Sequence, residues 1–225
     1  MTLASLLTRA SVLVCAAALV AGCSSVVAAH VPPVPPPAVD DVLSPKPDQK
    51  VAVFAGGCFW GVQAVFQHVR GVIQATSGYA GGDEATAHYE MVGTGNTGHA
   101  ESVQVVYDAS KVTYGTLLRI FFAVAHDPTQ LNQQGPDQGT QYRSALFVLN
   151  PEQRKVATAY IEQLDGGAVF PSPIATQVVD YNGFYPAEDY HQDYATLHPT
   201  EPYIMMYDAP KVRALADHFK DLYKR

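Results

Sequence analysis

A cysteine in a glycine-rich turn is the first group in this chain that could do chemistry. Cys58 lies within residues 56–61 (GGCFWG), after an apolar run and before apolar residues at helical spacing. We therefore expect a strand-to-helix turn, where free N–H groups and the helix dipole lower the pKa of a thiol. A thiolate there would be a nucleophile. The position is equally compatible with a small, inert, buried cysteine.

A carboxyl group in an apolar strand is the second candidate. Glu101 is expected to share one strand face with Val103, Val105 and Tyr107. If the strand buries this carboxyl, desolvation raises its pKa, and the protonated form can serve as a general acid. The sequence leaves open the alternative that Glu101 lies at the strand end and is solvated.

The elements that must position these groups are strands mixed with helices. Their order does not alternate strictly, which indicates an α+β domain with two layers. We expect strands over residues 51–55, 72–76, 101–107, 145–149 and 175–181, and a glycine-rich loop over 77–83. The expected helices cover 62–69, 117–125, 151–164, 187–197 and 212–222.

The first 47 residues differ in character from the rest. Residues 1–22 carry one charge, Arg9, and an apolar stretch too short for a settled membrane span, a pattern typical of a signal peptide. The stretch ends in LVAGCS, which is similar to the lipobox of bacterial lipoproteins and would make Cys23 a lipidated N-terminus. An ordinary cleavable signal is the alternative. Residues 23–47 are rich in proline and predict an extended tether, followed by a catalytic domain over 48–225.

Composition and cysteine usage exclude several functions. The chain has 225 residues and a net charge of −7 without a basic stripe, so nucleic acid is not an expected partner. Its three cysteines are Cys15, Cys23 and Cys58. Cys15 would leave with the signal and Cys23 would be lipidated, so Cys58 would be the only thiol. The absence of a Cys-x-x-Cys motif excludes a dithiol redox pair or a cysteine zinc site there.

Three motifs together resemble the peptide methionine sulfoxide reductase family of A type. They are residues 57–61 (GCFWG), 98–101 (GHAE) and 137–144 (DQGTQYRS), in the family's order within about 51–207. Residues 184–192 (FYPAEDYHQ) are also similar to a family segment. The resemblance implies a two-layer α+β sandwich with a ferredoxin-like core and a mixed sheet. It also implies reduction of the S epimer of methionine sulfoxide, free or in proteins, as antioxidant repair.

The chemistry of a sulfoxide assigns roles to the candidate residues. Cys58 would attack the electrophilic sulfur and become a sulfenic acid, and Glu101 would donate protons to the leaving oxygen. By resemblance, the phenols of Tyr89 and Tyr142 would hold that oxygen, and Asp137 would orient the site.

Three further residues are expected to bind the substrate rather than react with it. Phe59 and Trp60 would form an apolar wall for the terminal methyl group of methionine. Gly57 would allow a close approach of the substrate to the backbone.

The chain departs from many family members in its C-terminal half. Those members carry one or two resolving cysteines there, and no cysteine follows Cys58 here. An external thiol must therefore resolve the sulfenic acid, from a thioredoxin-like protein, a glutaredoxin-like protein or a small molecule. We expect no bound cofactor, and a monomer anchored to a membrane of the cell envelope or periplasm.

Two other classes of function compete with this interpretation. A cysteine hydrolase would pair Cys58 with His99 or His191. A metal-binding lipoprotein would use His88, His99, His126 and His191, which are scattered without the spacing of metal ligands.

Overall fold

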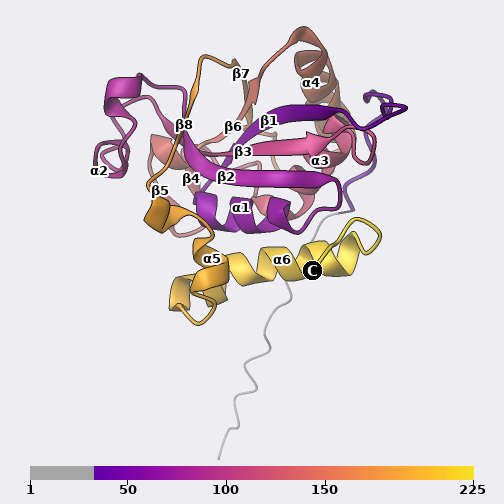
Figure 1. The fold of residues 1–225 in the computed structure, drawn as a ribbon. Coiled ribbons are helices and arrows are strands. Elements are labelled where there is room, and N and C mark those ends of the chain that lie inside the picture. Colours follow the sequence, from indigo (N-terminus) through magenta and orange to yellow (C-terminus); the bar gives the residue numbers. More distant parts are fainter. Residues whose placement is uncertain (1–32) are drawn as a thin grey trace, which may run out of the picture.

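A six-stranded sheet forms the centre of the computed structural model, which describes residues 33–225 (Figure 1). The strand order is β7-β6-β1-β3-β2-β8. Only β6 and β7 are parallel, so the sheet is mixed, as expected. The strands are β1 (Gln49–Gly56), β2 (Val72–Ala80), β3 (Ala100–Asp108), β6 (Ser144–Val148), β7 (Gln177–Asp180) and β8 (Phe184–Pro186), and a separate hairpin joins β4 (Gln133–Gln134) to β5 (Asp137–Gln138).

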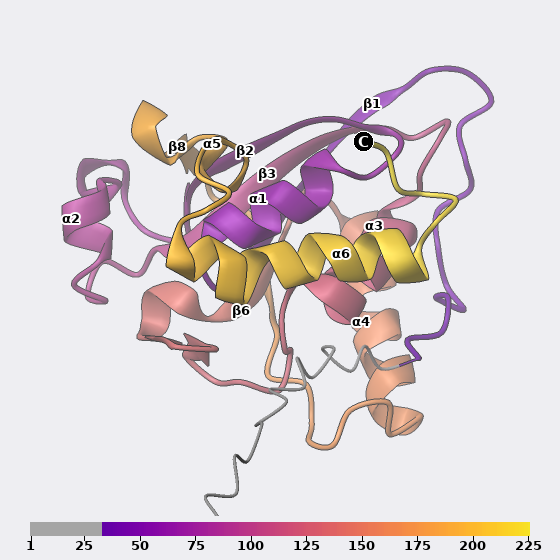
Figure 2. The same cartoon turned by 90° about the horizontal axis from the view of Figure 1, so that it is seen from below.

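The helices pack mainly on one face of this sheet. They are α1 (Phe59–Gln67), α2 (Tyr89–Val92), α3 (Tyr114–Ile120), α4 (Pro151–Gly166), α5 (Tyr194–Leu197) and α6 (Ala209–His218). π-helical segments continue α3 over Phe121–Ala125 and precede α6 over Ile204–Asp208. α6 lies along α1 on the side away from the sheet (Figures 1 and 2). None of the helices described is long and apolar enough to cross a bilayer.

The alternation of side chains along β1 supplies two apolar clusters. Ala52 and Phe54 belong to the main core, which includes residues of α1, α3 and α4. Val53 and Ala55 point to the opposite face, into a smaller cluster with Phe147 of β6. The α+β class is therefore as the sequence predicts.

Two predicted segments are wrong. β2 continues to Ala80 where a loop was expected from residue 77, because its end pairs with both β3 and β8. The helix expected over 187–197 is a 3₁₀ turn, Asp189–His191, followed by the short α5. Asp193 between them has φ +57°, and the side chain of Gln192 bonds to the backbone of Ser77 instead of leaving room for a helical turn.

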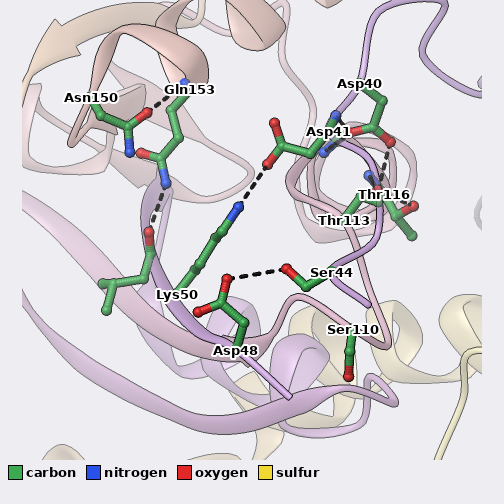
Figure 3. Close-up of polar contacts among 12 residues, drawn as sticks. Asp40, Asp41, Ser44, Asp48, Lys50, Ser110, Thr113, Thr116, Asn150 and Gln153 are labelled. Atoms are coloured by element: carbon green, nitrogen blue, oxygen red, sulfur yellow. Dashed lines mark hydrogen bonds and ion pairs between the residues drawn. The ribbon is translucent and has the colours of Figure 1, made fainter. Parts of the chain in front are cut away.

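The proline-rich segment lies against the domain where the structure describes it. Val34 is buried, and the Pro35 carbonyl accepts a 2.6 Å hydrogen bond from the Tyr160 hydroxyl on α4. The Asp40 carboxylate accepts a 2.6 Å bond from Thr113 at the start of α3 (Figure 3). Packed structure therefore begins before the predicted boundary at residue 48. The predicted signal peptide and Cys23 lie outside the described residues.

Candidate active site

The cysteine turn is built as the sequence predicts. β1 ends at Gly56, α1 begins at Phe59, and Cys58 is the N-cap residue between them with φ −52°. Gly57 has φ +87°, in the left-handed region that favours glycine. A Cβ on Gly57 would overlap the side chain of Gln134, so the glycine makes room for Gln134.

Glu101 lies beside this turn and is buried. It is the second residue of β3, and only 3% of its surface is exposed. The backbone N–H of Phe59, the residue that follows Cys58, donates to Glu101 Oε2 over 3.0 Å. This bond holds the carboxyl beside the cysteine turn. Burial raises the pKa of Glu101 to about 8, although the Phe59 hydrogen bond opposes the shift. Glu101 is therefore mostly protonated at neutral pH, and the solvated alternative is wrong.

The Cys58 thiol is buried as well, and this overturns one expectation. Burial raises its pKa well above the ordinary value, and the carboxyl groups of Glu101 and Asp208 raise it further. The backbone N–H of Trp60 and the ammonium of Lys211 act in the opposite direction. The predicted lowering of this pKa is wrong for the resting site, because desolvation outweighs the helix N-terminus.

Two tyrosines interact electrostatically with the cysteine and the acid. Tyr89 begins α2, and Tyr142 ends the 3₁₀ turn Thr140–Tyr142. Burial raises the pKa of both phenols, and in both cases Glu101 and Cys58 add to the shift. Both hydroxyls therefore keep their protons at neutral pH and can donate hydrogen bonds.

Asp137 is fixed by a tyrosine that the sequence did not single out. The Tyr203 hydroxyl donates a very short hydrogen bond to Asp137 Oδ2. The Tyr203 ring meets Trp60 edge-on with centroids 6.0 Å apart. Sixty-six positions separate Tyr203 from Asp137. No local pattern could have joined them.

The two aromatic residues after Cys58 have different settings. Phe59 is 1% exposed and packs against Tyr79 and His191, with ring centroids 5.9 and 5.1 Å apart. Trp60 is half-buried and stacks on Tyr194 at 3.9 Å, and its indole N–H donates to His191 Nδ1 over 3.2 Å. Trp60 therefore keeps apolar surface that a ligand could contact, whereas Phe59 is part of the core.

Residues 184–192 contribute Glu188, which fixes Tyr79 and the start of α2 at Tyr89. Glu188 accepts a 2.8 Å bond from the Tyr79 hydroxyl and a 2.9 Å bond from the Tyr89 backbone N–H. Sequence reasoning gave Glu188 no role, and its only signal was the resemblance of this segment to the family.

His99 and His191, the two histidines that a hydrolase would use, bond to groups other than the cysteine. The His99 ring bonds to the N–H of Gly82 and the carbonyl of Asp83. Across residues 33–225, no histidine is hydrogen-bonded to the Cys58 sulfur, so the geometry does not support the hydrolase. The same residues contain no group of three or more His, Cys, Asp or Glu side chains that could hold a metal ion.

Known proteins match this chain along most of its length. The family described as "Peptide methionine sulfoxide reductase" matches residues 50–223. Peptide methionine sulfoxide reductase MsrA 2 of Mesorhizobium japonicum is 59% identical over 177 residues, covering 79% of this chain and 91% of that relative. The protein of the same name from Synechocystis sp. is 52% identical over 193 residues, covering 85% and 90%.

Two solved structures share the fold. Methionine sulfoxide reductase A of Corynebacterium diphtheriae is 34% identical with a TM-score of 0.59, over 70% of this chain and 78% of that chain. Mxr1 from Saccharomyces cerevisiae in reduced form is 31% identical with a TM-score of 0.59, over 72% and 94%.

Proposed function

The chain belongs to the peptide methionine sulfoxide reductase family, and from this premise we propose how its site works. The protein is an oxidoreductase that reduces methionine sulfoxide, a protein-repair reaction. We propose that the substrate is the S epimer, free or within proteins, and that Cys58 is the nucleophile.

The observation that carries the proposal is the contact between Glu101 and the cysteine turn. The 3.0 Å hydrogen bond from the Phe59 N–H holds a buried, protonated carboxyl beside Cys58. A sulfoxide bound with its sulfur at Cys58 would place its oxygen within reach of this acid. Protonation of the oxygen makes the sulfur more electrophilic and the oxygen a better leaving group.

The reaction transfers one oxygen and two electrons. The Cys58 sulfur attacks the sulfoxide sulfur and the sulfur–oxygen bond breaks, the oxygen leaving as water with one proton from Glu101 and one from the thiol. Water then attacks the Cys58 sulfur, the new sulfur–sulfur bond breaks to release methionine, and a proton of that water returns to the Glu101 carboxylate. In the net reaction, thiol and sulfoxide become a Cys58 sulfenic acid and methionine. Because burial favours the thiol, loss of its proton accompanies the binding of substrate or the attack.

The surrounding residues would bind and orient the sulfoxide. Tyr89 and Tyr142 would donate hydrogen bonds to its oxygen, since both phenols remain protonated. Trp60, with the buried Phe59 beside it in the sequence, would form the apolar wall for the methyl group. Asp137 would orient the site through its bond to Tyr203, and Gly57 would contribute only backbone.

An external thiol would restore the enzyme. Cys58 is the only cysteine within residues 33–225, so no second thiol of this region can form a disulfide with it. A donor thiol would attack the sulfenic acid and release water, and a second thiol would release the mixed disulfide. A thioredoxin-like protein, a glutaredoxin-like protein or a small thiol would fit this chemistry, without a bound cofactor.

Two further proposals concern the location of the protein in the cell and the type of its α+β core. We propose a lipoprotein signal over residues 1–22, lipidation at Cys23 and a monomer anchored in the cell envelope or periplasm, supported by the sequence pattern alone. We also propose that β1, α1, β2, β3, α3 and β6 form a ferredoxin-like core. The antiparallel order β6-β1-β3-β2 supports that assignment.

A single-turnover experiment tests the proposed chemistry. Protein prepared without residues 1–23 is mixed with methionine sulfoxide in the absence of thiol, and the products and protein mass are measured. We expect about one methionine per Cys58, from the S epimer only, and a mass gain of one oxygen. Cys58→Ser should release none. A loss of two hydrogens in place of the oxygen gain would overturn the single-cysteine mechanism.

The anchor is tested separately from the chemistry. Cys23→Ala in the full chain should carry no acyl chains when examined by mass spectrometry of membrane fractions. Acyl chains found on that variant would remove Cys23 from the proposal.

A further inference from the structure

We propose that Asp208 and Lys211 form a buried charged pair that sets the electrostatic balance at Cys58, acting as positioning residues for the reductase reaction. Neither residue belongs to the motifs that suggested the function. The proposal rests on the role proposed above for Cys58.

The pair is unusual in its burial. Asp208 ends the π-helical segment Ile204–Asp208 and has 0% of its surface exposed. Its Oδ1 lies 3.1 Å from Lys211 Nζ, one turn further on, and the Lys211 side chain is 18% exposed. Asp208 Oδ2 has no hydrogen-bond partner among the described residues. A buried carboxylate with one unbonded oxygen is costly, so Lys211 is its main stabilising partner.

Gly61 gives this pair access to the helix that carries the cysteine. A Cβ on Gly61 would overlap the Asp208 carboxylate and lie 2.8 Å from Lys211 Nζ. Gly61 is three residues after Cys58, so both lie on the same side of the first turn of α1. The missing side chain thus lets one negative and one positive charge reach the side of α1 that holds the sulfur.

The two charges act on the thiol in opposite directions. Asp208 raises the pKa of Cys58 and Lys211 lowers it, both less than burial does. The other titratable groups that interact electrostatically with Cys58 are Glu101 on β3 and the phenols of Tyr89, Tyr142 and Tyr203, and Asp137 on β5 raises the pKa of all three phenols. Lys211 is the positively charged group that lowers the pKa of Cys58. Removal of one member should therefore leave the effect of the other on the pKa of Cys58 unopposed.

The alkylation rate of Cys58 measures this balance without any sulfoxide. Full-length protein is treated with iodoacetamide across a pH series, and modification of the Cys58 peptide is followed by mass spectrometry. Lys211→Met should slow the reaction near pH 8 by roughly tenfold, because loss of the ammonium raises the pKa of Cys58 further and leaves less thiolate. Lys211→Arg keeps the charge and should stay within about twofold of wild type. The exposed Lys220→Met is the matched control and should change nothing.

Asp208 gives the opposite expectation. Asp208→Asn should accelerate alkylation several-fold, and the double variant with Lys211→Met should return toward wild type because both charges are gone. A merely structural role would move both single variants in the same direction. That result, or an unchanged rate in Lys211→Met, would overturn the proposal. If Asp208→Asn fails to fold, the contrast between Lys211→Met and Lys211→Arg still decides.

The alkylation assay also separates this proposal from the proposed function. If Cys58→Ser kept full reductase activity, the nucleophile assignment would fail while the alkylation rates would still report on the charged pair. If the nucleophile assignment holds, the single-turnover rate of Lys211→Met should fall in parallel with its alkylation rate, and Lys211→Arg should restore both.

Discussion

The two ends of strand β3 each carry an acidic side chain with little exposure, and their surroundings differ. Glu101 near the start receives one hydrogen bond, from the Phe59 N–H. Asp108 at the end receives bonds of 2.7 and 3.0 Å from the hydroxyl and N–H of Ser110, and a 3.3 Å bond from the Asp48 N–H. Burial raises the pKa of Glu101 to about 8, whereas the Ser110 hydrogen bonds lower that of Asp108 to about 2.

The contrast shows that the number of hydrogen-bond donors around a buried carboxyl sets its pKa. Glu101 has one donor and can act as an acid, whereas Asp108 has three and stabilises the fold. Near Asp108, the Asp40 carboxylate is likewise satisfied, by Thr113 and by the Gly115 N–H at the start of α3. Near Glu101, polar atoms without partners include Asp208 Oδ2 and His191 Nε2. The active-site end thus keeps a carboxyl with a raised pKa, whereas hydrogen bonds lower the pKa of the carboxyl at the other end.

The largest effect should come from removing the acid proton at the active-site end. Glu101→Gln keeps the size of the side chain and cannot protonate the sulfoxide oxygen. General acid catalysis contributes roughly 10²–10⁴-fold, so the first turnover, followed by rapid quench, should slow by about a hundredfold or more. Asp108→Asn is the matched control at the other end of the strand. An unchanged rate in Glu101→Gln would remove this acid from the mechanism.

The same substitution should stabilise the protein at alkaline pH. Between about pH 4.5 and 8, Glu101 is protonated when folded and ionised when unfolded, so the folded state binds more protons and loses stability as pH rises. One pKa unit corresponds to about 1.4 kcal/mol, so the wild-type penalty at pH 8 should reach several kcal/mol. Urea unfolding at pH 5 and pH 8 should show Glu101→Gln gaining stability relative to wild type. Equal differences at the two pH values would contradict a raised pKa.

Asp108→Asn should show the reverse pattern. The pKa of Asp108 is lowered in the folded state, so its contribution is present above the unfolded pKa near 3.8 and disappears as pH falls through about 2. The variant should be less stable than wild type at pH 7, equal to it below pH 2, and within about twofold in the first-turnover rate. A variant as stable as wild type at pH 7 would show that the Ser110 bonds do not stabilise the fold.

The smallest effect should come from the docked N-terminal segment. Asp40→Ala removes the acceptor for Thr113 and Gly115 and should cost about 1 kcal/mol in the free energy of unfolding, without a change in rate. Asp41→Ala is the matched control, because the Asp41 side chain contributes a 3.7 Å ion pair with Lys50 and its loss should change stability less (Figure 3). Equal losses in the two variants would show that Asp40 does not anchor the segment.

Local sequence patterns predicted the structural features that depend on neighbouring residues alone. The strand, the glycines and the apolar spacing after Cys58 predicted the turn, and the apolar alternation after Glu101 predicted the strand that buries it. The pKa of Cys58 could not be predicted in this way, because its sign depends on burial by segments far away in the sequence. Asp208 and Lys211, which also influence it, come from a segment 150 positions later.

Contacts between segments far apart in the sequence explain the other features that were not predicted. Tyr203 reaches Asp137 across 66 positions, and Gln192 reaches Ser77 across 115 positions and replaces an expected helix by two short turns. Prolines in the N-terminal segment predicted a chain without packed structure, and residues 33–47 form no helix or strand. What the composition could not show is that its carbonyl groups and Asp40 find donors on α3 and α4.

The titration of the two carboxyl groups of β3 tests this account most directly. With ¹³C-labelled Glu and Asp side chains, NMR can follow both carboxyl carbons in one sample, assigned by Glu101→Gln and Asp108→Asn. A midpoint near 8 is expected for Glu101 and one near 2 for Asp108. A midpoint for Glu101 near that of a solvated glutamate, about 4.3, would contradict it.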